Sequence, residues 1–361
     1  MMQYTRPHLR LITNSAAETP PSVEHTPPTH VDEFDEAFAA VEALMNRVVN
    51  DHVHGPLRSM VTEHLKTGGK FIRARIALRS AMALGLDPRD SVNVAAACEL
   101  LHNATLVHDD LQDGDTVRRG HPTVWAKHGM AQAINVGDVL LMLATLALEN
   151  SPINPNIRWH LSAAMTRRAA ETASGQALEL VLLERGWMGR DTYLRAARGK
   201  TGPFFALPIE AAVLCAGHPP EHARLLGDAT LTLGALYQVC DDIMDLNGNK
   251  GRSSIGNDIR EGKVSALTVA HLEATPEDEP HLLETLLRPR EETSDAEVHA
   301  WAKQFEAGGA LRGARKLASQ LLAQVDCEPD LLKEEALHDL VTRTAQKLFA
   351  PLETLTDGEQ T

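Results

Sequence analysis

The sequence predicts an all-α protein. Apolar residues recur with helical spacing in one long segment after another, and no alternating strand pattern of useful length interrupts them. The chain has 361 residues, of which 43% are hydrophobic and only 4% aromatic, so Leu, Ala, Val and Met must fill the core. A chain of this length can bury a sizeable core in one large domain.

Periodicity and breaker residues place the helices within that domain. Residues 1–31 are rich in Pro, Thr, Ser and His and lack periodicity, which predicts a disordered leader before a domain at 32–350 and a tail at 351–361. The charged, Pro-containing stretch 273–295 is typical of an exposed loop with a short helix. The remaining patterns predict helices at Asp35–Val53, Leu57–Leu65, Phe71–Met82, Ser91–Gln112, Gln132–Leu148, Pro155–Glu184, Asp191–Ala197, Phe204–Ala216, Glu221–Leu246, Lys263–Leu272, and near 296–325 and 330–350.

Charge and cysteine usage exclude several classes of protein. The net charge is -14 and no basic face is evident, which argues against a nucleic-acid partner. No apolar stretch reaches transmembrane length, and the start of the chain has no apolar signal core. The four cysteines lack C-x-x-C spacing and indicate buried thiols in a reducing, cytoplasmic compartment: Cys98, Cys215, Cys240 and Cys327.

Two short acidic clusters carry most of the functional information. Asp109-Asp110-Leu111-Gln112-Asp113 and Asp241-Asp242-Ile243-Met244-Asp245 each read D-D-x-x-D after an apolar helical run. The first and last carboxylates of such a motif share one helix face, and their mutual repulsion is relieved by a hard cation such as magnesium. One cluster alone would more often be a solvated helix end. Two of them, each followed by basic residues, favour a site for metal and phosphate.

The residues after the first cluster supply candidate phosphate ligands. Gly114 breaks the helix, so Arg118 and Arg119 lie on a loop that can fold back over the carboxylates. Guanidinium groups bind phosphate oxygens in bidentate fashion, although an isolated Arg-Arg pair is usually only solvated surface. His102 lies on the same helix face as Asp109 and Asp113. It is equally consistent with an anion ligand and with a core histidine.

Further cations stand beside turns and helix ends elsewhere. In Thr67-Gly68-Gly69-Lys70, the glycines permit a tight turn, and Lys70 and Arg73 stand one turn apart at a helix start. Lys200-Thr201-Gly202-Pro203 is predicted to open another helix with a cation at its entrance. Gln238 shares a face with the second cluster, and Lys250, Arg252 and Lys263 follow that cluster on a loop.

In order and spacing, these segments resemble the trans-isoprenyl diphosphate synthases, the polyprenyl synthetase family. The resemblance runs from about Gly68 to Leu272 and implies the isoprenoid synthase fold, an antiparallel helix bundle around a central cavity, usually as a homodimer. The segments that carry it are Gly68-Gly69-Lys70-x-x-Arg73, His102 with Asp109-Asp110-x-x-Asp113, Arg118-Arg119-Gly120, Gly137-Asp138, Gly175-Gln176, Lys200-Thr201, Tyr237-Gln238-x-x-Asp241-Asp242-x-x-Asp245, Asp258 and Gly262-Lys263.

The resemblance also implies residue roles. Three Mg²⁺ ions per site would be held by Asp109, Asp113 and Asp241, with Asp110, Asp242 and Asp245 supporting them through water or cations. Arg118, Lys200 and Lys263 would bind an allylic diphosphate, and Lys70, Arg73, His102 and Arg119 would bind isopentenyl diphosphate, with Thr201 and Gln238 alongside. The implied product is an all-trans prenyl diphosphate.

Some positions depart from the family pattern, and others bear on product length. Phe71 stands where a basic residue is common, Arg252 lies near but not at a frequent Gly-Lys pair, and Ser265-Ala266 replaces Thr-Leu. Family members that stop growth early have bulky residues four and five positions before the first Asp; here these are Thr105 and Ala104, so geranylgeranyl diphosphate (C20) or longer is expected. A terpene synthase on the same fold and a non-catalytic partner subunit are the alternatives.

Overall fold

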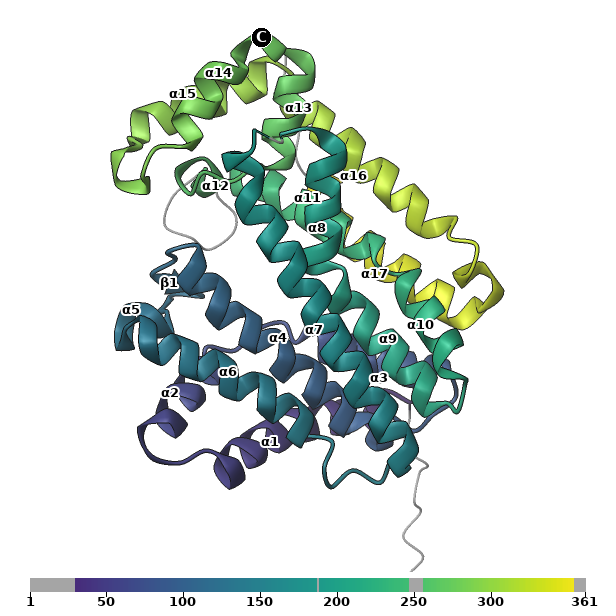
Figure 1. Ribbon diagram of the computed structural model, residues 1–361. Coiled ribbons are helices and arrows are strands. Elements are labelled where there is room, and N and C mark those ends of the chain that lie inside the picture. The colour runs from purple at the N-terminus through teal and green to yellow at the C-terminus, as the bar shows by residue number, and fades with distance from the viewer. Residues whose placement is uncertain (1–29, 187, 247–255, 354–361) are drawn as a thin grey trace, which may run out of the picture.

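The computed structural model describes residues 30–186, 188–246 and 256–353, and this part of the chain confirms an all-α protein (Figure 1). Its strands are limited to an antiparallel pair of two-residue strands, β1 (Val117–Arg118) and β2 (His121–Pro122). The predicted leader up to residue 29, the tail from residue 354, and the loop cations Lys250 and Arg252 lie outside the described residues.

The α-helices follow one another along the chain with short connections. They are α1 (His30–His52), α2 (Gly55–Lys66), α3 (Ile72–Ala83), α4 (Val92–Gln112), α5 (Val124–His128), α6 (Met130–Leu146), α7 (Pro155–Glu184), α8 (Arg190–Thr201), α9 (Pro203–Cys215), α10 (Pro220–Asp228), α11 (Thr232–Leu246), α12 (Asn257–Arg260), α13 (Ala266–Ala274), α14 (Glu279–Leu286), α15 (Asp295–Ala307), α16 (Ala310–Asp326) and α17 (Glu335–Glu353).

Long helices from different parts of the chain pack side by side (Figure 1). Helix α4 packs between α3 and α6, and the long helix α7 packs against α8 and α9. Helix α11 packs against α8, α16 and α17. The buried side chains are mostly Ala, Leu and Val, as the composition predicts. No helix within the described ranges is long and apolar enough to cross a membrane.

Two of the predicted helices are broken in the structure. The pattern at Glu221–Leu246 becomes α10 and α11, because the chain turns at Thr230, whose hydroxyl donates to the Gly227 carbonyl at 2.7 Å. The pattern near 296–325 becomes α15 and α16, because Gly309 adopts a positive φ of 78° between them. Helical periodicity passes through both breaks, so the apolar pattern does not reveal them.

Three local expectations are also corrected. Lys200 lies in the last turn of α8 and not at the entrance of the next helix, and a cation there is favoured by the helix dipole. The helix expected from Lys263 begins only at Ala266, so that Lys263 lies in the loop before α13, where the run of cations places it. Cys327 is exposed, whereas Cys98 and Cys240 are buried as expected and Cys215 is partly buried.

Candidate active site

The first acidic motif closes helix α4. Asp109 lies in its last turn, and the Asp113 N–H donates to the Asp109 carbonyl at 2.8 Å. Gly114 then adopts a positive φ of 70° and turns the chain away. Because the apolar side of α4 is buried against α3 and α6, packing fixes the end of the helix that carries the motif.

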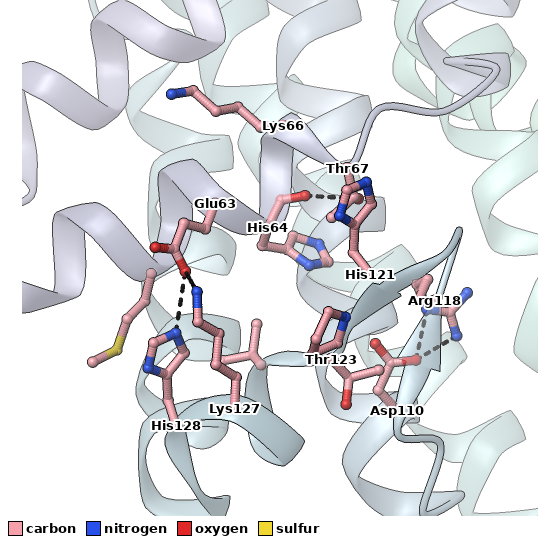
Figure 2. A pocket seen from close by; sticks show the side chains of 13 residues that line it. Glu63, His64, Lys66, Thr67, Asp110, Arg118, His121, Thr123, Lys127 and His128 are labelled. Atoms are coloured by element: carbon pink, nitrogen blue, oxygen red, sulfur yellow. Dashed lines mark hydrogen bonds and ion pairs between the residues drawn. The ribbon is translucent and has the colours of Figure 1, made fainter.

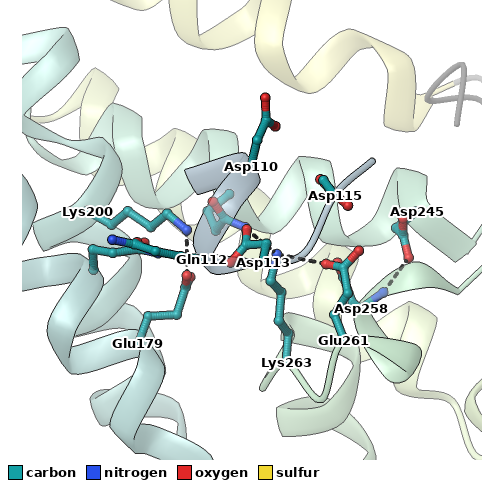
Figure 3. Close-up of polar contacts among 12 residues, drawn as sticks. Asp110, Gln112, Asp113, Asp115, Glu179, Lys200, Asp245, Asp258, Glu261 and Lys263 are labelled. Carbon is teal, nitrogen blue, oxygen red and sulfur yellow. Dashed lines mark hydrogen bonds and ion pairs between the residues drawn. The ribbon is translucent and has the colours of Figure 1, made fainter. Parts of the chain in front are cut away.

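Two lysines and two glutamates surround these carboxylates (Figure 3). The Lys263 Nζ lies 2.7 Å from Asp113 Oδ2 and 2.8 Å from Glu261 Oε2. Lys200, from α8, forms an ion pair with Glu179 of α7. The motif, the loop before α13 and helices α7 and α8 therefore meet at one place, although their residues are far apart in the sequence.

The electrostatics of this place favour an additional cation. Burial raises the pKa of the Asp109 carboxyl to about 6; Asp113 and Glu179 add to the shift, while Lys200 and Lys263 oppose it. Burial alone would lower the pKa of Lys263, but Asp113 and Glu261 outweigh it and raise that pKa well above its usual value. The carboxylates are thus crowded and only partly neutralised by the lysines.

The second acidic motif lies on α11 and is tied to the same loop. The Asp245 Oδ2 accepts the Asp258 N–H at 3.1 Å, and the Lys263 N–H donates to the Asp258 carbonyl at 2.8 Å. Lys263 thus connects the two motifs. Its side chain contacts Asp113 of the first motif, and its backbone is bonded to Asp258, which in turn is bonded to Asp245 of the second. Asp242 points elsewhere: it is buried and receives hydrogen bonds from Gln238 and from α8 and α13. Asp241, one turn before Asp245, is partly buried.

Asp110 and Arg118 form a pair on another side of α4. Arg118 Nε lies 2.6 Å from Asp110 Oδ1, and burial raises the pKa of the Asp110 carboxyl to about 7 although Arg118 opposes the shift. Both residues line a pocket of about 210 Å³, together with side chains of α2, β2 and α5 (Figure 2). The pair fixes the hairpin that follows the motif against the end of α4.

A second group of predicted ligands gathers near α3. Arg73 is buried, with its guanidinium 5.2 Å from the ring centre of Phe205 and 5.8 Å from that of Tyr237. Glu99 of α4 is buried beside it and accepts the Ala74 N–H at 3.2 Å. These contacts hold the cationic side chain of Arg73 in a pocket of rings and one carboxylate.

His102 and Arg119 complete this second group, and Lys70 lies at its edge. The His102 ring packs 5.5 Å from Phe204, and burial, with repulsion from Arg73 and Arg119, lowers the pKa of His102 well below its usual value. The Arg119 guanidinium packs over Gly69, where an added Cβ would lie only 2.7 Å from it. Gly69 therefore leaves the space that this approach uses. Lys70 is exposed at the same turn.

The donor set fits magnesium. Aspartate oxygens are the ligands that hard divalent cations prefer, and the pKa of Asp109, raised mainly by burial and further by Asp113 and Glu179, indicates a carboxylate that such an ion would stabilise. Over the described ranges, no three acidic, His or Cys side chains already converge as a metal cage. Lys200 and Lys263 stand near Asp109 and Asp113, and they supply part of the positive charge that these carboxylates require.

The sequence alone did not single out Glu179, Glu99, Glu261, His64 or Tyr193. Glu179 had an available signal, because it lies one turn after Gly175 and Gln176 on the buried face of α7. Tyr193 stands seven residues before Lys200 and so shares its helix face. Glu99 and His64 had no such signal, because burial of a charged or polar side chain depends on neighbours that are distant in the sequence.

Comparison with known proteins gives a consistent result. The family model described as polyprenyl synthetase matches residues 54–304. A short chain isoprenyl diphosphate synthase of Methanothermobacter thermautotrophicus is 31% identical over 287 residues, covering 79% of this chain and 87% of that protein. A geranylgeranyl pyrophosphate synthase of Geoglobus acetivorans is 30% identical over 313 residues, covering 84% and 96%.

Solved structures agree with these relatives. The structure of the Geoglobus acetivorans geranylgeranyl pyrophosphate synthetase superposes with a TM-score of 0.72 at 27% identity, covering 88% of this chain and 98% of that one. A polyprenyl synthetase from Streptomyces coelicolor superposes with a TM-score of 0.72 at 26% identity, covering 87% and 98%. The all-α architecture is thus that of the isoprenoid synthase fold.

Proposed function

The chain belongs to the polyprenyl synthetase family and is a trans-prenyl diphosphate synthase, and on that premise we propose that it joins isopentenyl diphosphate to an allylic diphosphate with the help of magnesium. The observation that carries the proposal is the meeting of Asp109 and Asp113 with Lys200 and Lys263, drawn from segments far apart in the chain. The product we propose is an all-trans prenyl diphosphate of C20 or longer.

Asp109, Asp113 and Asp241 would hold the magnesium, for which we keep the expected count of three ions. When bound, the metal supplies positive charge to the diphosphate oxygens. Lys200 and Lys263 would add cations beside Asp109 and Asp113, and Arg118 would add one from the other side of α4, so that together they stabilise the negative charge that develops as the allylic C–O bond breaks. Asp110 takes part indirectly, because it holds Arg118 in place.

Isopentenyl diphosphate would bind the second group, Lys70, Arg73, His102 and Arg119. Its double bond attacks the allylic cation, and the proton then leaves to the released diphosphate, since no dedicated base stands out among the proposed ligands. His102 is partly buried, and its lowered pKa favours a neutral ring that donates a hydrogen bond to the diphosphate. Phe204, Phe205 and Tyr237 line this side with rings and help to exclude water, which would quench the cation.

A terpene synthase is the second candidate, and the second group of ligands favours the condensing enzyme over it. A cyclase uses one diphosphate and has no need for the buried Arg73 or for Arg119 above Gly69. A non-catalytic subunit needs neither acidic motif, and here both are whole.

We also propose a cytoplasmic homodimer. Helix α6 exposes Met130, Ile134 and Met142 on one side, with the charged Asp138 between the last two, and Trp159 of α7 is 72% exposed. An apolar face of this kind is typical of a surface covered by a partner. The four free cysteines suit a reducing compartment.

An assay with labelled isopentenyl diphosphate, geranyl or farnesyl diphosphate and magnesium tests the function. We expect label to enter a longer prenyl diphosphate, and Asp109→Ala to lower turnover about a hundredfold or more, because the metal bridge is lost. Exposed Asp90→Ala is the matched control and should keep full turnover. A hydrocarbon formed from the prenyl diphosphate alone would indicate a cyclase, and no product of either kind a non-catalytic subunit.

A further inference from the structure

The middle aspartate of the second motif sits at a junction of three helices. Asp242 of α11 is 3% exposed, and both its carboxylate oxygens accept hydrogen bonds. The Tyr193 hydroxyl of α8 donates to Oδ2 at 2.6 Å, and the Ala266 N–H, at the start of α13, donates to the same oxygen at 2.8 Å. Gln238, one turn earlier on α11, donates to Oδ1 at 2.9 Å.

Helices α8, α11 and α13 each carry, or directly follow, a residue of the proposed active site. Tyr193 stands seven residues before Lys200 on the same face of α8, and Ala266 stands three residues after Lys263. Asp242 itself lies beside Asp241 on α11. The junction thus fixes the two lysines relative to the second motif.

Tyr193 is suited to be a permanent donor in this junction. It is 3% exposed, and burial together with Asp242 raises its pKa well above the usual value, so the hydroxyl keeps its proton. A buried carboxylate is stable only when its oxygens are paired, and Tyr193 provides the shortest of its three described bonds.

We propose that Tyr193 is a positioning residue for the condensation: through Asp242 it sets where Lys200 and Lys263 stand around the allylic diphosphate. The inference rests on the proposed function and extends it to a residue that touches no substrate. It also gives Asp242 a role different from that of Asp241, as a hydrogen-bond acceptor between helices and not as a metal ligand.

Tyr193→Phe removes only the hydroxyl and keeps the ring in the core. We expect the KM for the allylic diphosphate to rise about tenfold, the scale of one hydrogen bond to a charged group, and the KM for isopentenyl diphosphate to change less than about twofold. Calorimetry with inorganic diphosphate and magnesium should show the same loss of affinity without turnover. Thr285→Val, which removes a buried hydrogen bond to Trp301 in α15, is the control and should leave both KM values unchanged.

Ala266→Pro tests the same junction from α13. It removes the N–H that Asp242 accepts and adds ring carbons at a buried position, at a first helical position where proline is tolerated and after an extended Ser265. We expect the same selective rise in allylic KM. If Tyr193 acts through Asp242, the double variant Tyr193→Phe/Asp242→Asn should match Asp242→Asn alone.

The outcomes separate the inference from the proposed function. A wild-type chain that does not condense the two substrates overturns both. An active wild type whose Tyr193→Phe and Ala266→Pro variants keep the allylic KM, or raise both KM values equally, overturns the inference alone. Additive effects in the double variant would also overturn it.

Discussion

At the scale of single residues, His64 shows how burial changes the acid–base behaviour of a side chain. It is 6% exposed, and burial, with repulsion from Arg118 and Arg119, lowers its pKa from 6.5 to about 4. The unfolded chain therefore binds a proton at this residue between about pH 6.5 and pH 4, and the folded chain does not. By linkage, folding stability falls as the pH falls through that window.

We expect the free energy of unfolding to lose up to about 3 kcal/mol through His64 between pH 7 and pH 4. In His64→Gln that contribution disappears, so the variant should lose less stability on acidification. Urea unfolding at several pH values measures the difference. Parallel pH profiles for the two proteins would contradict the expectation.

Thr105 is the residue at which the structure sharpens the expectation about product length. Ala104 is 0% exposed and packed in the core, whereas Thr105 keeps exposed surface and lies one turn before Asp109 on the same face. Thr105→Phe should therefore shorten the product by at least one isoprene unit, because the ring blocks the growing tail. Ala104→Phe should instead cost about 1–3 kcal/mol of stability by overpacking.

Mass spectrometry of the products and thermal unfolding distinguish the two substitutions. A C15 product from the wild type, or an unchanged product from Thr105→Phe, would show that another residue ends the chain. Phe204 is then the first alternative to test, since its ring already packs against His102.

The sequence predicts residue identities in the site better than it predicts their partners. The acidic motifs and the nearby cations are short patterns, so their chemistry can be read locally. That Lys263 pairs with Asp113, 150 residues away, and that Lys200 pairs with Glu179, depends on how helices pack. Helical periodicity gives the face of a residue and not its neighbour, which is why Glu99 and His64 emerge only from the structure.

At the scale of helices, glycines allow the closest contacts around the site. A Cβ on Gly175 of α7 would lie 2.1 Å from the backbone nitrogen of Lys200 in α8. A Cβ on Gly234 of α11 would lie 2.1 Å from the backbone nitrogen of Gly202. Backbone thus meets backbone where α7, α8 and α11 come together. The turn at Thr230 belongs to the same arrangement, because it directs α11 toward Gly202.

Gly175→Ala should force α7 and α8 apart at Lys200. We expect a loss of about 1–3 kcal/mol or more in stability, since neither backbone can yield without moving a helix, and a raised KM for the allylic diphosphate. Gly189→Ser is the control: it adds a side chain at the start of α8, where nothing lies within 4 Å and serine suits a helix N-cap. Chemical denaturation and steady-state kinetics measure both effects. Equal stability of the two variants would mean that the contact is not tight in solution.

At the scale of the whole molecule, the proposed homodimer would form through the exposed side of α6. Sedimentation of the wild type should give twice the chain mass of 39.3 kDa. Ile134→Glu places a charge in the middle of that face and should give monomers with unchanged helix content. Leu332→Glu, at another exposed leucine, should remain dimeric. A monomeric wild type, or a dimeric Ile134→Glu, would mean that this face is not the interface.

The ion pairs around the site, here called the rim, join segments that are far apart in the sequence. They therefore bear on the order in which parts of the structure form during folding. Arg290 lies 3.6 Å from Asp115 and 3.3 Å from Glu261, and Lys263 joins Asp113, so the rim closes very long loops of chain. Neighbouring helices such as α7 and α8, or α9 and α10, need only short loops to meet, and local contacts form sooner than distant ones. On refolding, helix content should return before enzymatic turnover, and the delay between circular dichroism and activity would measure how late the catalytic rim assembles.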